Sequence, residues 1–456
     1  MKNLLCFLLS GAALSCGAQW STITLDPGRV QITGIGNADR AMAVGGFDSN
    51  YNNSFDILDY HWGDASYHDD LVLSEARYKI ACAINGNLLI TAGGINSDFG
   101  TATGTVEIFD LSVDQLVANA QLSQARLELG AAAVGTKVLF AGGLIVNWNG
   151  SIYEIQGTSD VVDIYDVATE TWSTATLSQA RGGLAVAVSG TKAFFAGGYQ
   201  GNNVASDVVD IYDAATDSWS TATLSQARAP FGGGAAVGTK VMFAGGTQAG
   251  INHSDVVDIY DMITQQWSTA TLSVARCGVQ AAVTGSYALF AGGGDDSMPD
   301  WSFLNAYDAV DIYNAATGTW STATMSAARI NFAAAGSANK VFLFGGVDET
   351  ISNFPTVVDV FTDASQIGIN EPSQPRDLDA WPNPFVSKLN IGALDALEGS
   401  TVEVYDARGA QVASVLLKRS LEIDLSFLND GLYELRVLKS DGSGVIASGS
   451  VVKAGR

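Results

Sequence analysis

The sequence DVVDIYDAATDSWSTATLSQAR, at residues 207–228, recurs almost letter for letter at residues 160–181 and 255–276. Looser copies end at Arg77, Arg126 and Arg329. Self-similarity at a fixed period is typical of repeat architectures, in which each copy forms one supersecondary unit. We therefore expect most of the 456 residues to form one repeat array rather than several unrelated domains.

Each copy has the pattern of four short strands. An arginine closes every unit, and successive arginines are 47 to 55 residues apart. They are Arg29, Arg77, Arg126, Arg181, Arg228, Arg276 and Arg329. After each arginine come an alternating small and apolar run, a short turn, and a second run that ends in a double glycine. A loop of variable length, a third run and a run around a tryptophan complete the unit, which predicts a four-stranded antiparallel sheet.

The order of these landmarks resembles the kelch repeat family. In one unit the glycine pair Gly197-Gly198 is followed by Tyr212 and then by Trp219. The resemblance covers residues 20–362 and implies a β-propeller, in which each four-stranded sheet is a blade.

A truncated copy suggests how the propeller closes. Trp20–Leu25 reads WSTITL, and Trp20 precedes Arg29 by the same spacing that separates Trp219 from Arg228. The last unit, in contrast, has no such run after its third strand. The sequence thus predicts an all-β, seven-bladed propeller in which the N-terminal strand completes the last blade and removes an open sheet edge.

Residues 1–18 are predicted to be a secretory signal peptide, because Lys2 precedes an apolar run and small residues. We expect cleavage after Ala18; lipidation at Cys16 is the alternative. No later stretch is long and apolar enough to span a membrane. Residues 19–362 form the propeller in this interpretation, and residues 363–379 a linker.

Residues 380–456 alternate like the strands of a small β-sandwich. Pro382–Phe385, the Gly431-Leu432-Tyr433 step and the Val451-Val452-Lys453 ending resemble the C-terminal sorting domain of type IX secretion cargo. The resemblance implies the type IX secretion machinery as a partner of residues 380–456. It also implies export through the periplasm to the outside or the outer-membrane surface of a Gram-negative bacterium.

The net charge of -24 is concentrated in the repeats. Residues 19–379 hold 14 Lys and Arg against 38 Asp and Glu, whereas residues 380–456 hold 8 against 9. This balance argues against nucleic acid and anionic membranes as partners. After cleavage only Cys82 and Cys277 remain, in repeats that lie across the ring, so we expect two buried thiols without a disulfide.

No phosphate-binding loop, nucleophile elbow or HExxH motif occurs in the sequence, which favours a non-enzymatic role. His61 and His68 lie at the spacings of the repeat tyrosine and tryptophan, so we interpret them as substituted packing positions. His253 lies alone in a loop. We predict no cofactor and no metal site; Ca²⁺ in the Asp- and Asn-rich loops at residues 47–53 and 295–300 is a minor alternative.

The predicted binding surface is the face that carries the arginines and the loops after the double glycines. Loops on a rigid scaffold commonly carry binding residues. The candidate binding residues are Arg126, Arg181, Arg228, Arg276 and Arg329, with the loop aromatics Trp148, Tyr153, Trp301 and Phe303. For most of the arginines we favour a structural role, pairing with carboxylates of a neighbouring blade such as Asp163 and Asp210.

These observations favour an exported, monomeric, non-catalytic propeller that binds an extracellular protein or glycan. A second hypothesis is a carbohydrate-processing enzyme, since the kelch family includes sialic-acid epimerases and copper-radical sugar oxidases. A third is a structural or adhesive surface protein. The sequence alone does not identify the ligand.

Overall fold

The computed structural model describes residues 19–25, 28–48, 56–61, 66–96, 101–149, 153–201, 204–229, 233–248, 252–297, 302–348, 354–363, 376–377, 380–391, 400–406, 410–416, 422–438 and 445–454. The predicted signal peptide with its cleavage site and Cys16, most of the predicted linker, and Trp301 lie outside these residues. The chain divides into two compact units, Met1–Gln366 and Ile367–Arg456. Every regular element of the described part is a β-strand, and no helix there is long and apolar enough to cross a membrane.

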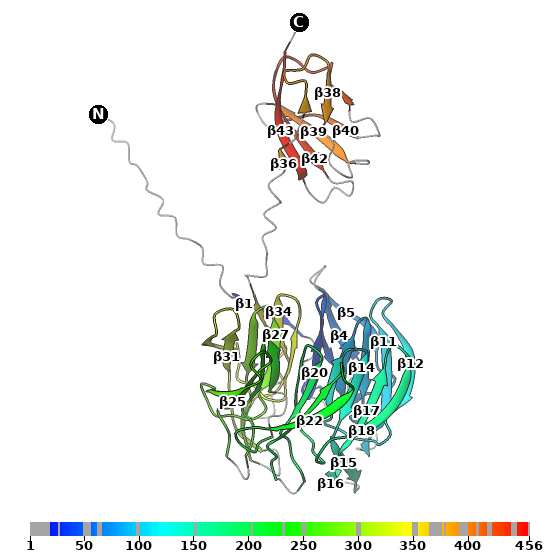
Figure 1. Ribbon diagram of the computed structural model, residues 1–456, viewed down its shortest axis with the longest axis vertical. Helices are drawn as coiled ribbons and strands as arrows, with labels where there is room; N and C mark the ends of the chain where they lie inside the picture. The colour runs from blue at the N-terminus through cyan, green and yellow to red at the C-terminus, as the bar shows by residue number, and fades with distance from the viewer. Residues whose placement is uncertain are drawn as a thin grey trace, which may run out of the picture. The chain divides into compact units, whose positions relative to one another are not determined.

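The first unit contains seven four-stranded antiparallel sheets within the described ranges (Figure 1). The first three sheets are β2 (Thr33–Gly36), β3 (Arg40–Val44), β4 (Asp56–His61) and β5 (Ser66–Val72); β7 (Ala81–Asn85), β8 (Leu88–Ala92), β11 (Thr105–Asp110) and β12 (Gln115–Gln121); and β13 (Gly130–Val134), β14 (Lys137–Ala141), β17 (Val161–Asp166) and β18 (Thr171–Thr176). The next three are β19 (Ala185–Ser189), β20 (Lys192–Ala196), β21 (Val208–Asp213) and β22 (Ser218–Thr223); β23 (Gly234–Val237), β24 (Lys240–Ala244), β25 (Val256–Asp261) and β26 (Trp267–Thr271); and β27 (Gln280–Thr284), β28 (Tyr287–Ala291), β31 (Ala309–Asn314) and β32 (Thr319–Thr324).

The remaining sheet joins the two ends of the repeat region. It consists of β33 (Ala333–Gly336), β34 (Lys340–Phe344), β35 (Val357–Thr362) and β1 (Gln19–Thr24). β1 runs antiparallel to β35 with Trp20 opposite Phe361, and the two rings lie 5.4 Å apart in an edge-to-face arrangement. Trp20 thus packs on the third strand, as Trp219 does on Tyr212 at 5.2 Å.

The first strands of the seven sheets form the inner ring. Each contacts the first strand of the sheets on either side, in the closed cycle β2, β7, β13, β19, β23, β27 and β33. Small residues allow this approach: a Cβ on Gly34 would lie 2.4 Å from the Ala334 carbonyl oxygen, and one on Gly234 would lie 2.3 Å from that of Val186. Glycine is required at these two positions because another side chain would overlap the adjacent backbone.

Apolar residues on the second strands fill the space between sheets. Phe195, Phe243 and Phe290 are fully buried, and half-buried tryptophans of the fourth strands pack near them at ring distances of 5.8 to 6.3 Å. These contacts place the repeat tryptophans in the core rather than at a binding surface.

A β-bulge changes the predicted register of the first sheet. The pairing shifts between Ile57 and Asp59, and Tyr60 lies opposite Tyr67. Tyr212 and Trp219 hold this pairing elsewhere. The interpretation of the two histidines is therefore wrong by one position: His61 pairs with Ser66, and His68 with Asp59. The extra residue of the bulge accounts for the shift.

The second unit is a small β-sandwich of two sheets. One contains β36 (Arg376–Asp377), β43 (Val445–Lys453), β42 (Gly431–Leu438), β39 (Thr401–Asp406) and β40 (Gln411–Leu416). The other contains β37 (Ala380–Trp381), β38 (Lys388–Ile391) and β41 (Glu422–Asp424). Its buried core combines Leu389 and Ile423 from the smaller sheet with Val402, Leu435 and Val451 from the larger one.

Candidate functional site

Each blade has two ends, because its strands are antiparallel. The first strand begins just after the arginine and the second strand ends at the double glycine, so both lie on the same face of the propeller. We call this face, with the loops that follow the double glycines, the loop face. The opposite face carries the turns between the first and second strands and between the third and fourth strands; we call it the turn face.

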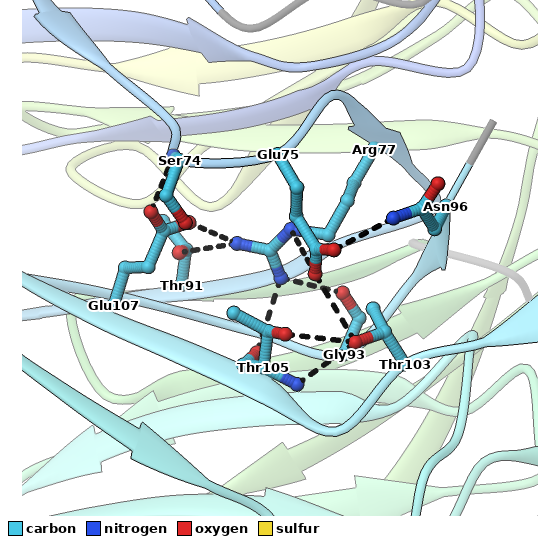
Figure 2. Close-up of polar contacts among 9 residues, drawn as sticks. All are labelled: Ser74, Glu75, Arg77, Thr91, Gly93, Asn96, Thr103, Thr105 and Glu107. Carbon is cyan, nitrogen blue, oxygen red and sulfur yellow. Dashed lines mark hydrogen bonds and ion pairs between the residues drawn. The ribbon is translucent and has the colours of Figure 1, made fainter. Parts of the chain in front are cut away.

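The arginine of the second blade shows how the repeat arginines are held (Figure 2). Arg77 is fully buried, and its Nη1 donates to the carbonyl oxygens of Gly93 at 2.8 Å and Thr105 at 3.1 Å. Its Nη2 donates to a carboxylate oxygen of Glu107, whose other oxygen accepts the backbone N–H of Ser74 at 2.6 Å. One carboxylate on the third strand thereby fixes the segment that leads into the blade.

The same arrangement recurs in the following blades. The buried ion pairs are Arg126–Asp163, Arg181–Asp210, Arg228–Asp258, Arg276–Asp311 and Arg329–Asp359. In each case the carboxylate also accepts the backbone N–H of a serine: Ser123, Ser178, Ser225, Ser273 and Ser326, respectively. In the first blade Leu58 occupies the corresponding backbone position, opposite Ala43.

The carboxylate partners lie in the blade that the arginine enters, not in a neighbouring blade as expected. Asp210, for example, is on the third strand of the sheet whose first strand follows Arg181. The five candidate binding arginines are 0% exposed. Burial lowers their pKa values, and the paired aspartates only partly offset this effect. In this conformation none of them presents its guanidinium to a ligand.

The loop aromatics lie on two hairpins of the loop face. β15 (Leu144–Trp148) pairs with β16 (Tyr153–Thr158), which places Trp148 opposite Tyr153 (Figure 1). β29 (Gly294–Ser297) pairs with β30 (Ser302–Ala306), which places Phe303 opposite Asp296. The sequence placed these residues in long loops, and the structure shows strand pairs within the loops of the third and sixth blades; it describes the backbone of Trp148, Tyr153 and Phe303.

The inner end of the loop face carries a second set of residues, two positions after six of the seven repeat arginines; Pro230, two positions after Arg228, lies outside the described residues. Their backbone φ values are positive: 53° at Gln31, 53° at Lys79, 52° at Glu128 and 51° at Asn331, with glycine at positions 183 and 278. Each precedes an innermost strand by two residues. We call these six residues the axial mouth.

Backbone hydrogen bonds join neighbouring members of the axial mouth. The Gln31 N–H donates to the Asn331 carbonyl oxygen at 2.9 Å, and the Gly183 N–H donates to that of Glu128 at 3.3 Å. Positive φ alone does not indicate function, because Asp114, Glu170, Asp217 and Gln265 adopt it in turn-face turns. The position at the axis and the side chains make the mouth a candidate site.

The polar side chains of the mouth form one arc. Asn331, Gln31, Lys79 and Glu128 belong to four consecutive blades around the ring, and all are half-buried. Lys79 Nζ forms an ion pair with Glu128 across the boundary of two blades, and the side chains are 10% and 13% exposed. The Gln31 Oε1 atom is shielded from solvent and has no hydrogen-bond partner in the part of the chain that the structure describes.

The mouth is open on the other side. A Cβ on Gly278 would meet no atom within 4 Å. Beside it, Tyr307 Oη donates to the Asp295 carboxylate at 3.1 Å, and Asn305 Nδ2 donates to it at 2.9 Å. Burial raises the pKa of Tyr307, and the Asp295 charge raises it further. Burial lowers the pKa of His253, and the negative charge of Asp295 opposes this shift. His253 therefore interacts with Asp295, although its position in the sequence suggested an isolated residue.

The axial mouth was not predicted from the sequence, although a signal was present. Two positions after the aligned arginines the residue is polar or glycine in six of the seven units and Pro230 in the other, while apolar residues occur around it. The sequence could not show that these positions meet at the axis, because this depends on contacts between the first strands of neighbouring blades. Across the described ranges, no group of three or more His, Cys, Asp and Glu side chains has an arrangement that could hold a metal ion.

The motifs that suggested a sorting domain meet in the second unit. Asn383 Oδ1 accepts the backbone N–H of Val452 at 2.8 Å, and its Nδ2 donates to the Ser450 carbonyl oxygen at 3.1 Å. Lys453 is 7% exposed, and its ammonium donates to the carbonyl oxygens of Leu425, Ser426 and Leu428. The two ends of this unit are thus joined by the residues that characterise it.

Comparisons with known proteins agree with both units. The Kelch motif family matches residues 180–223, and the family described as "Secretion system C-terminal sorting domain" matches residues 379–447. A solved structure titled "Structure of YjhT" is 15% identical, with a TM-score of 0.50, and the alignment covers 66% of this chain and 99% of that one. This similarity shows the fold alone. No curated protein sequence matches the chain.

The first unit is therefore a kelch-type β-propeller. The protein as a whole is an exported kelch propeller module with a type IX secretion sorting domain, which directs it to secretion or to the cell surface.

Proposed function

We propose that the protein binds an extracellular glycan or protein at the axial mouth, without catalysing a reaction. The observation that carries this proposal is the polar arc of Asn331, Gln31, Lys79 and Glu128. These side chains lie at the inner end of the loop face, where a closed ring of strands holds them in fixed positions. Preorganised polar groups on a rigid scaffold are the common form of a ligand site.

The raised hairpins β15–β16 and β29–β30 support this proposal. They belong to the third and sixth blades and rise from the face that holds the mouth. Residues on such hairpins extend a binding surface outward without altering the propeller core. The route of export is part of the proposal: the predicted signal peptide takes the chain into the periplasm of a Gram-negative bacterium before the sorting domain acts.

The repeats themselves supply suitable variants for a test. The glycines at positions 183 and 278 occupy the same positive-φ position as Gln31 and Glu128. Replacing Gln31 or Glu128 with glycine therefore removes a mouth side chain while keeping a residue that the fold already accepts there. Glu170→Gly is the matched control, because Glu170 has a φ of 55° in a turn-face turn.

The experiment is a binding screen of the purified full chain against glycan arrays and extracellular protein extracts. We expect Gln31→Gly and Glu128→Gly to weaken a detected interaction at least tenfold and Glu170→Gly to leave it unchanged. If both mouth variants bind as the unmodified chain does, the mouth is not the site. If the unmodified chain binds nothing, the binding function is wrong.

A further inference from the structure

The basic residues of the propeller fall into two groups. Between residues 20 and 362 the sequence contains five lysines and eight arginines. Arg40, Lys137, Lys192, Lys240 and Lys340 begin second strands and therefore lie on the turn face. The others, the seven repeat arginines and Lys79, belong to the loop face.

The cations of the loop face are neutralised or buried. Six repeat arginines are 0% exposed and Arg29 is 4% exposed. Lys79 is the remaining basic residue of this face, and Glu128 forms an ion pair with it. An anionic ligand would therefore meet no exposed, unpaired cation here, and it would lie on a propeller with a large acidic excess.

The polar side chains at the mouth are either uncharged, as in Gln31 and Asn331, or paired with an opposite charge, as in Lys79 and Glu128. Gln31 and Asn331 provide carboxamides, each with two donors and an acceptor. Gln31 Oε1 has no partner among the described residues, so it can accept a hydrogen bond from a ligand once the half-buried Gln31 side chain turns toward the opening. Next to the Gly278 opening, Tyr307, Asn305 and Asp295 form a hydrogen-bonded group.

We propose that the axial mouth takes an uncharged, hydroxyl-rich carbohydrate. This inference rests on the binding function proposed above and narrows its ligand. Hydroxyl groups both donate and accept, and so they match a site that offers carboxamides and a carboxylate. At Gly278 a Cβ would meet no atom within 4 Å, so no side chain closes the mouth opposite the polar arc.

The test uses the purified full chain on a glycan array with three classes of probe: neutral oligosaccharides, sialylated or sulfated oligosaccharides, and uronic-acid polymers. A basic peptide serves as a separate probe of the acidic surface. We expect neutral oligosaccharides to bind and the other probes to bind at least tenfold more weakly. The affinity for the neutral probe should change less than twofold between about 50 and 500 mM salt, because no ligand charge is screened.

Gln31→Gly should reduce the affinity for the neutral probe at least tenfold, whereas Glu170→Gly should change it less than twofold. Preferential binding of acidic glycans or of the basic peptide, with affinity falling as salt rises, would overturn this inference and leave the binding function in place. The same conclusion would follow if the chain bound a protein but no glycan, and if Gln31→Gly weakened that binding. Binding of no probe and no protein would reject both proposals.

Discussion

Arg181 and Asp210 form a buried ion pair, and the second carboxylate oxygen of Asp210 accepts the backbone N–H of Ser178 at 3.0 Å. One aspartate thus binds two points of the segment that links adjacent blades. Both charges are almost completely shielded from solvent. Removing one partner of such a pair leaves an uncompensated charge in the interior.

Arg181→Met is therefore expected to destabilise the propeller by about 3–5 kcal/mol. Lys137→Met is the control, since Lys137 pairs across two blades with Asp217 at 2.6 Å but the aspartate is 69% exposed. We expect the control to cost at most about 1 kcal/mol. Urea unfolding monitored by tryptophan fluorescence measures the free energy of unfolding of both variants. Equal losses of stability would contradict a structural role of the Arg181–Asp210 pair.

Deletion of Trp20–Leu25 should abolish cooperative unfolding of the propeller. The deletion removes β1 and leaves β35 as an open sheet edge, with Phe361 no longer covered by Trp20. Differential scanning calorimetry of the purified chain provides the measurement. An unchanged propeller transition would show that β1 is dispensable.

Cys82 should not react with a thiol reagent in the folded protein. Burial raises its pKa to about 12, so at neutral pH almost none of it is the reactive thiolate. Neither Cys82 nor Cys277 forms a disulfide, as the sequence predicted, and both are buried. A thiol-titration assay should detect both cysteines only after denaturation; rapid labelling in native buffer would contradict the buried placement.

Two lysine–aspartate pairs of the turn face should give the protein an acid-dependent component of stability. Hydrogen bonds from Lys192 and Thr191 lower the pKa of Asp213 from 3.8 to about 2. Lys240 and the turn backbone have the same effect on Asp261. Because these pKa values are depressed in the folded state, the contribution is present above about pH 4 and is lost as the pH falls to 2. The difference in Tm between the unmodified chain and Asp213→Asn should shrink over this range, and a constant difference would contradict the assignment.

Lys453→Met should loosen the C-terminal unit. It leaves the carbonyl oxygens of Leu425, Ser426 and Leu428 without their ammonium donor, at a cost of about 2 kcal/mol. Hydrogen exchange of β42 and β43 should become faster, whereas Lys388→Met, which alters a pair that is 56% and 44% exposed, should leave it unchanged. Unaltered exchange in the Lys453 variant would contradict the anchoring role.

The repeat pattern carried most of the information on the fold. The regular spacing of Arg181, Gly197, Tyr212 and Trp219 was enough to predict an all-β kelch propeller, because local strand patterns and turn residues are encoded within each unit. The register of the first blade was missed, since the bulge beside Ile57 inserts one residue that fixed spacings cannot reveal.

The candidate site was less accessible to sequence analysis. The spacing identified Asp163 and Asp210 as arginine partners but did not show which blade they share with the arginine. Gln31 and Glu128 lie far apart in sequence, and only the packing of the inner strands brings them to one opening. Trp148, Tyr153 and Phe303 lie on hairpins within the long loops between second and third strands, and sequence spacing could not show that these loops pair.

The pairing of β1 with β35 has a consequence for the timing of folding. The two strands are more than 300 residues apart in sequence, and their register joins Thr24 to Val357 and Gln19 to Thr362. Among the described residues of the propeller, this strand pair joins the segments that lie farthest apart in sequence, and it also completes the last sheet. A nascent chain cannot form it until the whole repeat region has been synthesised, so β1 stays unpaired while the strands of the earlier blades are already available to form their sheets.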